Sequence, residues 1–150
     1  FAIMTLNVMK LQFIILLSMI MVLSSSSCKK RKLHPVPSIP FDITININLP
    51  SYSELLGVGG YAYVQGGSKG IVVYRRNTSE FVAFDRHSPA NEGACEDPLE
   101  NSADNFLQLT DQCSGAVFSL YDGSPISGAE VGLRMYITAF DGNANLRIYN

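Results

Sequence analysis

Hydrophobic and polar residues alternate strictly over residues 41–49, FDITININL, where every odd-numbered position is Phe, Ile or Leu. A period of two places these side chains on one face of an extended chain and predicts a half-buried β-strand. Pro50 ends the strand. The next segment, SYSELLGVGG, predicts a short helical turn or loop that the Gly pair at its end breaks.

Further apolar runs of strand length follow: YAYVQ, GIVVYRR and EFVAFDR, separated by Gly66-Gly67 and by the turn residues 77–79. The segment FLQLT comes after an acidic loop. The segments AVFSLYDGSPI and LRMYITAFDGNANLRIYN each contain an Asp-Gly pair, at 122–123 and 141–142, which is a strong hairpin signal. Short strands without a long helical period predict an all-β domain of small antiparallel sheets.

The N-terminal part has a different pattern. From Met9 the sequence reads MKLQFIILLSMIMVLSSSSC, with a lysine, an apolar run over 11–23, four serines and Cys28. At about 1.5 Å per residue a helix over this run covers roughly 20 Å, short of a bilayer core of about 30 Å. The layout therefore predicts a secretory signal peptide.

Small residues directly before Cys28 resemble a bacterial lipoprotein signal, which implies that Cys28 is lipidated and becomes the mature N-terminus. An ordinary soluble-secretion signal and an uncleaved anchor are the alternatives, and the basic KKRK after Cys28 favours the anchor over soluble secretion. Prolines at 35, 37 and 40 predict an extended, solvated linker. We expect a signal peptide over 1–28, a basic and Pro-rich linker over 29–40, and a folded domain over 41–150.

Charge differs between these parts of the chain. From Leu33 onward six Lys and Arg residues stand against thirteen Asp and Glu, a net charge of −7. So acidic a domain is a poor nucleic-acid binder. The predicted partners are a membrane, bound through lipidated Cys28 and the KKRK segment, and a protein that the sequence does not identify.

The series YVQGGSKGIVVYRR, FVAFDR, CSGAVF, LYDGSPISGA, LRMY and LRIYN resembles the Rieske iron-sulfur domain, above all its short secreted lipoprotein members. The resemblance covers nearly all of residues 41–150 and depends on the order and spacing of the segments. It implies a Rieske-like fold in which two loops each give one Cys and one His to a 2Fe-2S cluster.

The residues at the implied ligand positions differ from those of the family. Aligned on Pro89, the first-loop ligands fall on Ser88 and Ala90; aligned on the Gly and Phe of SGAVF, the second-loop ligands fall on Asp111 and Ser114. The chain lacks all four expected ligands. The third family loop, usually Gly-Pro-Ala, corresponds to residues 127–129, Ser-Gly-Ala, and lacks the proline.

Many Rieske domains carry one further Cys in each of the two loops, and these two residues form a disulfide. By this resemblance Cys95 and Cys113 are predicted to be bonded, which also suits an exported protein. Free thiols are the alternative. With reduced thiols, Cys95, Cys113, Asp111 and His87 could instead ligate a single Zn or Fe ion, although no tight ligand spacing supports this.

Other polar residues are interpreted as structural. We expect His87 to be a surface loop residue and His34 an inert linker residue. The acidic loop could bind Ca²⁺, but the spacing of its carboxylates fits no EF-hand-like loop, so we interpret it as solvated. Its carboxylates are Glu92, Glu96, Asp97, Glu100 and Asp104. Four tyrosines are expected to pack in the core with their hydroxyls at its rim: Tyr74, Tyr121, Tyr136 and Tyr149.

These observations predict an exported lipoprotein of a bacterial cell envelope with a Rieske-like domain that has lost its cluster ligands. We expect no cofactor and no catalytic residues, and a role as a binding or assembly module. Two alternatives stay open: a 2Fe-2S electron-transfer protein and a mononuclear metal binder.

Overall fold

The computed structural model describes Lys10, residues 12–16 and residues 33–150. The contacts divide the chain into two units, 1–32 and 33–150. In the first unit the described residues are helical. Among the described helices none has the length and apolar character needed to cross a membrane. Cys28, with its predicted lipidation, lies outside the described residues.

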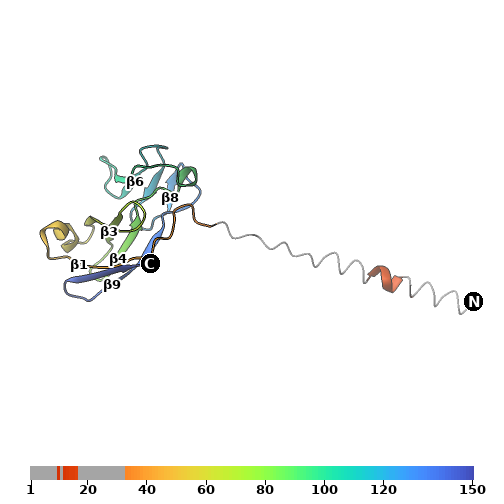
Figure 1. Ribbon diagram of the computed structural model, residues 1–150, viewed down its shortest axis with the longest axis horizontal. Coiled ribbons are helices and arrows are strands. Elements are labelled where there is room, and N and C mark those ends of the chain that lie inside the picture. The colour runs from red at the N-terminus through yellow and green to blue at the C-terminus, as the bar shows by residue number, and fades with distance from the viewer. Residues whose placement is uncertain (1–9, 11, 17–32) are drawn as a thin grey trace, which may run out of the picture. The chain divides into compact units, whose positions relative to one another are not determined.

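The second unit contains two antiparallel sheets (Figure 1). The larger has six strands, in the spatial order β1 (Asp42–Asn46), β10 (Asn145–Tyr149), β9 (Met135–Phe140), β4 (Phe81–Asp85), β3 (Ile71–Arg75) and β2 (Tyr61–Val64). Each neighbouring pair is antiparallel. The smaller has four strands, in the order β5 (Glu100–Asn101), β6 (Gln108–Thr110), β7 (Val117–Ser119) and β8 (Pro125–Ser127).

Two 3-10 turns complete the fold, η1 (Pro50–Leu56) and η2 (Ala90–Gly93). The prediction of an all-β fold of small antiparallel sheets is confirmed. Both Asp-Gly pairs join antiparallel strands, β7 to β8 and β9 to β10, and the segment after Leu49 forms the short helical turn η1. Strand β5 was not predicted, because it lies within the acidic loop and has only two residues.

Strands β3 and β4 are buried on both faces and divide the core into two clusters. Alternate residues of β3, Ile71 and Val73, join a cluster on the face of the large sheet that β1, β2, β9 and β10 also line. The intervening residues Val72 and Tyr74 join a second cluster with Leu109, Phe118 and other residues of the small sheet region. This explains why the β3 and β4 sequences are continuous apolar runs rather than alternating ones.

Part of the predicted linker packs against the β domain. Val36 is fully buried, and the Arg134 guanidinium donates two hydrogen bonds to its carbonyl, at 3.0 and 2.6 Å. His34 Nδ1 accepts from the Val36 N–H, so its Nε2 carries the proton and donates to the Gly132 carbonyl at 3.0 Å. The prediction of a solvated linker is therefore wrong for residues 34–36, and so is that of an inert His34, because His34 and Val36 each bond to a residue 98 positions further along the chain. Residues 37–40 are exposed.

A buried carboxylate at the end of β4 connects three parts of the fold. Asp85 is fully buried and accepts hydrogen bonds from the backbone N–H of Ser68 at 2.6 Å, Lys69 at 3.3 Å and His87 at 2.7 Å. It also accepts one from the Tyr136 hydroxyl on β9. Burial and this bond to the anionic Asp85 raise the pKa of Tyr136 well above its ordinary value, so the hydroxyl stays protonated and donates.

The tyrosine predictions are correct in part. Tyr74 and Tyr136 lie in the core. The Tyr136 hydroxyl, however, is not at the rim of the core, because it points inward to Asp85. Tyr149 is half-buried, and Tyr121 is 54% exposed, so the prediction that it packs in the core is wrong. Its ring instead lies beneath the Arg76 guanidinium, 4.9 Å from the ring centroid.

A substitution at Gly67 tests how much the packing around the Asp85 carboxylate contributes to stability. The φ of Gly67 is +62°, and an added Cβ would lie 2.6 Å from Asp85 Oδ2 and 2.7 Å from the Tyr136 hydroxyl. We expect Gly67→Ala to lower the free energy of unfolding by about 3 kcal/mol, from backbone strain plus overpacking. Gly142→Ala is the control. Gly142 also has a positive φ, +83°, but a Cβ added there would meet no atom within 4 Å, so this variant should lower the free energy of unfolding by only about 1 kcal/mol. Urea unfolding measures the free energy of unfolding of both variants. Equal losses of stability in the two would contradict the importance of close packing around Asp85.

Candidate functional site

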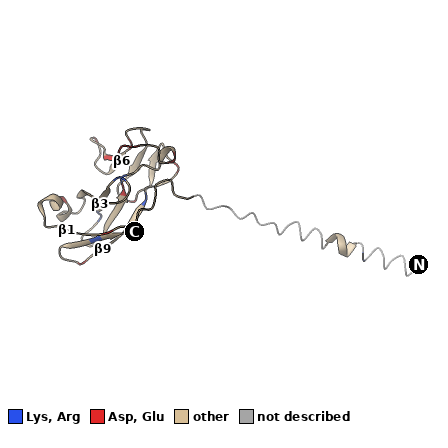
Figure 2. Ribbon diagram, in the orientation of Figure 1, with Lys and Arg blue, Asp and Glu red and all other residues tan. Residues whose placement is uncertain are grey.

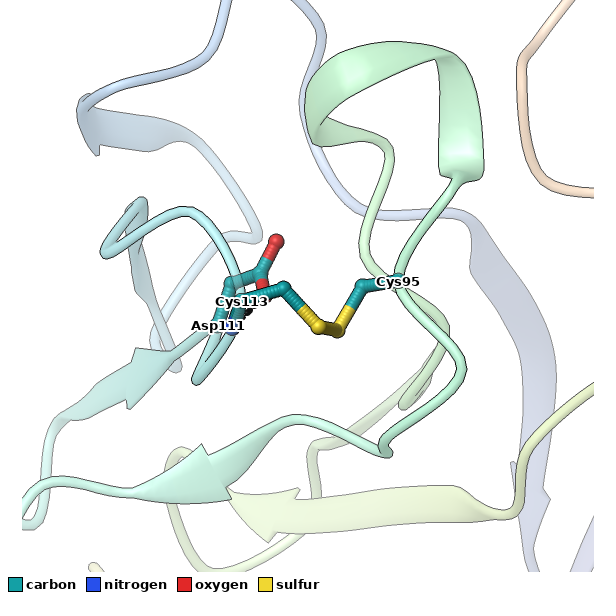
Figure 3. Close-up of side chains that lie close together, drawn as sticks. All are labelled: Cys95, Asp111 and Cys113. Carbon is teal, nitrogen blue, oxygen red and sulfur yellow. Dashed lines mark hydrogen bonds between the residues drawn. A yellow bond between two sulfur atoms is a disulfide. The ribbon is translucent and has the colours of Figure 1, made fainter.

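Two loops meet at one end of the small sheet. The first loop, residues 86–99, connects β4 to β5, and the second, residues 111–116, connects β6 to β7. The Cys95–Cys113 disulfide joins them, with a Cα–Cα distance of 5.8 Å (Figure 3). The predicted bond is therefore present. Closing a loop with a sequence separation of 18 residues contributes about 3 kcal/mol by the chain-entropy estimate.

Asp111 organises the second loop. Its side chain is only 2% exposed, and its carboxylate accepts hydrogen bonds from the Cys113 N–H at 2.8 Å, the Ser114 N–H at 3.3 Å and the Ser114 hydroxyl at 2.7 Å. Burial acts to raise the pKa of Asp111, but these bonds, with one from the Ser88 hydroxyl of the first loop, outweigh it and hold the pKa below its ordinary value. The carboxylate thus stays ionised and connects the two loops.

The four positions that the Rieske resemblance implies as ligands lie on these loops. Ser88, Ala90 and Asp111 are buried, whereas Ser114 is exposed. Their side chains offer two hydroxyls, one methyl and one carboxylate. A Rieske cluster needs two thiolates on one iron and two imidazoles on the other. The residues present do not fit that group.

His87 does not occupy a surface position, contrary to the sequence-based prediction. Its side chain is 8% exposed, its Nε2 lies 2.9 Å from the Gly93 carbonyl and its Nδ1 lies 2.8 Å from the Ser68 hydroxyl. A carbonyl only accepts, so Nε2 donates to Gly93, while Nδ1 is hydrogen-bonded to the Ser68 hydroxyl. Because both ring nitrogens are engaged, His87 fastens the 66–70 turn to the first loop.

The first loop reaches Gly93 through an unusual backbone conformation. Asn91, Glu92 and Gly93 all have positive φ, at 49°, 59° and 79°. Glycine adopts this region without cost and Asn tolerates it, but Glu92 is strained there. The bond from His87 to the Gly93 carbonyl and the neighbouring disulfide hold the loop in this shape.

Of the four residues predicted as candidates for a single metal ion, three lie together. The ligand atoms of Cys95, Asp111 and Cys113 all lie within 4.8 Å of one another (Figure 3). His87 does not belong to this group, because its ring is engaged elsewhere. In the disulfide form neither sulfur is a thiolate, so the group has one strong metal-binding atom, the Asp111 carboxylate oxygen.

Figure 2 marks the positions of the charged residues along the ribbon. The five carboxylates of the acidic loop are exposed, as the solvated interpretation expects. Glu96 pairs with Lys69 at 2.6 Å, and a hydrogen bond from Lys69 lowers the pKa of Glu96. This surface pair contributes little to stability but brings the first loop to the 66–70 turn.

A polar pocket next to this pair was not predicted. It has a volume of about 390 Å³ and is lined by residues 63–70 and Arg86. The Arg86 guanidinium lies 3.7 Å from the Tyr63 ring centroid, and its Nε donates to the Leu99 carbonyl at 2.8 Å. The sequence indicated only a turn at Gly66-Gly67, since nothing local to that turn identifies Arg86 as its neighbour.

No protein-family model and no curated protein sequence matches this chain. Among solved structures, it is similar to a protein from Mycobacterium tuberculosis assigned as the small subunit of an NADH-dependent nitrite reductase, with 16% sequence identity and a TM-score of 0.39. The match covers 75% of this chain and 96% of that one. A likeness at this level says nothing about what this chain binds or does.

The depressed pKa of Asp111 predicts how stability depends on pH. A carboxyl whose pKa is lower in the folded state stabilises the protein above its unfolded pKa of about 3.9, and this contribution is lost as the pH falls through the folded pKa. Asp111→Asn should lower the free energy of unfolding by about 1–3 kcal/mol at pH 7. In denaturant titrations from pH 7 to 2, the difference from wild type should shrink below about pH 4. A difference that stays constant down to pH 2 would contradict this role.

Proposed function

We propose that residues 41–150 form a Rieske-type domain without a 2Fe-2S cluster, which works as a non-catalytic binding or assembly module. One observation carries this proposal: where the family resemblance implies two Cys and two His ligands, the loops hold Ser88, Ala90, Asp111 and Ser114. None of these supplies the sulfur or imidazole donors that such a cluster requires.

The way the loops are closed supports the same proposal. The Cys95–Cys113 bond and the hydrogen bonds of Asp111 join the two loops directly. Protein contacts are therefore sufficient to hold the loops together, and a cluster is not needed as a cross-link. A fold that has lost its site keeps its surfaces, so binding is the function that the remaining structure favours over redox chemistry.

The iron content of the purified protein tests this proposal. We expect full-length protein, produced in cells with active cluster-assembly machinery, to be colourless and without the reduced-state EPR signal of a Rieske cluster. Iron and acid-labile sulfide should be far below one atom per chain. A cluster-containing Rieske protein from the same cells is the control. Two irons and two sulfides per chain would reject the proposal and favour the electron-transfer alternative.

We also propose that the domain is exported and anchored in the bacterial cell envelope through lipidated Cys28. The support is the sequence MKLQFIILLSMIMVLSSSSC, a short apolar run that ends in small residues before a Cys, and the KKRK that follows it. Basic residues next to a lipid anchor add attraction to anionic headgroups, and a single acyl chain gives only marginal binding by itself.

Metabolic labelling tests the anchor. Labelled palmitate should be incorporated into the wild type and not into Cys28→Ala, and the variant should move from the membrane to the soluble fraction. Cys113→Ala, which changes a different Cys, is the matched control and should keep the label. A Cys28→Ala variant that remains labelled or membrane-bound would contradict the lipoprotein assignment.

A further inference from the structure

We propose that reduction of the Cys95–Cys113 disulfide creates a zinc site, in which Cys95, Cys113 and Asp111 bind one Zn²⁺ ion between the two loops. Their ligand atoms already lie within 4.8 Å of one another (Figure 3). The site goes beyond the proposed binding function and uses a donor set different from that of a Rieske cluster. Formation of this zinc site requires neither the protein partner of the proposed binding module nor the lipid anchor at Cys28.

The disulfide is accessible to a reductant from one side. Cys113 is exposed, whereas Cys95 is only 5% exposed. One thiolate of a dithiol attacks the Cys113 sulfur and displaces the Cys95 thiolate, and its second thiol then releases Cys113. The dithiol loses two electrons and two protons and becomes a disulfide, while the protein gains two thiols. This step converts two inert sulfurs into potential ligands.

The three donors suit zinc. Two thiolates and a carboxylate are ligands that Zn²⁺ takes in tetrahedral sites, with Zn–S distances of about 2.3 Å, which places the two sulfurs roughly 3.8 Å apart. The Cα atoms of Cys95 and Cys113 lie 5.8 Å apart, so side-chain rotation can separate the sulfurs without moving the loops far. Binding releases the two thiol protons. Hard ions such as Ca²⁺ and Mg²⁺ do not favour thiolates.

The surroundings of Asp111 fix its carboxylate as a ligand. The Cys113 N–H and the Ser114 N–H and hydroxyl donate to it, and the Gly115 N–H donates to the Asp111 main-chain carbonyl at 2.8 Å. Outer contacts of this kind orient metal ligands and are needed for high affinity. His87 is held by Ser68 and Gly93, so the fourth position is left to water, which can enter beside exposed Cys113.

Cobalt provides a direct spectroscopic test, because Co²⁺ takes the same tetrahedral sites and is coloured. The full chain would carry Cys28→Ser, so that Cys95 and Cys113 are its two thiols. It would be reduced with a phosphine, which takes up oxygen from water as the disulfide is cleaved, and titrated with Co²⁺. We expect one Co²⁺ per chain with sulfur-to-cobalt charge-transfer and tetrahedral ligand-field bands, which one equivalent of Zn²⁺ removes. The oxidised protein should show neither band.

Two variants identify the ligands. Asp111→Asn should weaken Co²⁺ binding at least about tenfold. Asp122→Asn is the control, because it removes the same charge from an exposed turn where Asp122 accepts from Ser124. Cys113→Ser should halve the charge-transfer intensity per bound Co²⁺, since one thiolate remains. Formation of the disulfide in oxidised Asp111→Asn verifies that this variant folds.

Three results would each overturn the zinc site. One is a reduced protein without a charge-transfer band, and another is binding that is equal in the oxidised and reduced forms, which indicates carboxylates alone. The third is equal affinity of folded Asp111→Asn and Asp122→Asn. None of these results bears on the proposal of a cluster-less domain, which depends on iron and sulfide content.

Discussion

The carboxylate of Asp85 is the constraint on which the arrangement of the loops depends. It ends strand β4, has no exposed surface, and is bonded to the 66–70 turn, to the backbone of His87 and to the Tyr136 hydroxyl. A buried charge is costly unless it is fully hydrogen-bonded, so these groups must meet for the fold to be stable. Because His87 follows two residues later, the same carboxylate fixes where the first loop begins.

Beyond His87, several interactions along the first loop hold it in place. His87 bonds to Ser68 and to the Gly93 carbonyl, Lys69 pairs with Glu96, and Cys95 is bonded to Cys113 in the second loop. Local bonds of Asp111 give the second loop its shape. The two loops thus depend on protein contacts at the place where the Rieske resemblance implies metal ligands, which is the physical basis of the proposed loss of the cluster.

The sequence predicted best what depends on neighbouring residues. The apolar runs of β3 and β4 and the Asp-Gly turns are local patterns, and the structure has strands and hairpins there. Contacts between distant segments were missed. Tyr136 and Asp85 are 51 residues apart, and Arg134 and Val36 are 98 apart, so no periodicity connects them. The burial of His87 was missed for the same reason. The Cys95–Cys113 pair was found only through the family resemblance.

Native mass spectrometry of the intact protein, isolated from cells that assemble iron-sulfur clusters, distinguishes a domain closed by the disulfide alone from one that holds a 2Fe-2S cluster. It reports the thiol state and the bound inorganic atoms of the same molecule. We expect the mass of the processed chain less two hydrogen atoms, which corresponds to one disulfide and no cluster. A mass increased by two iron and two sulfur atoms would contradict this expectation.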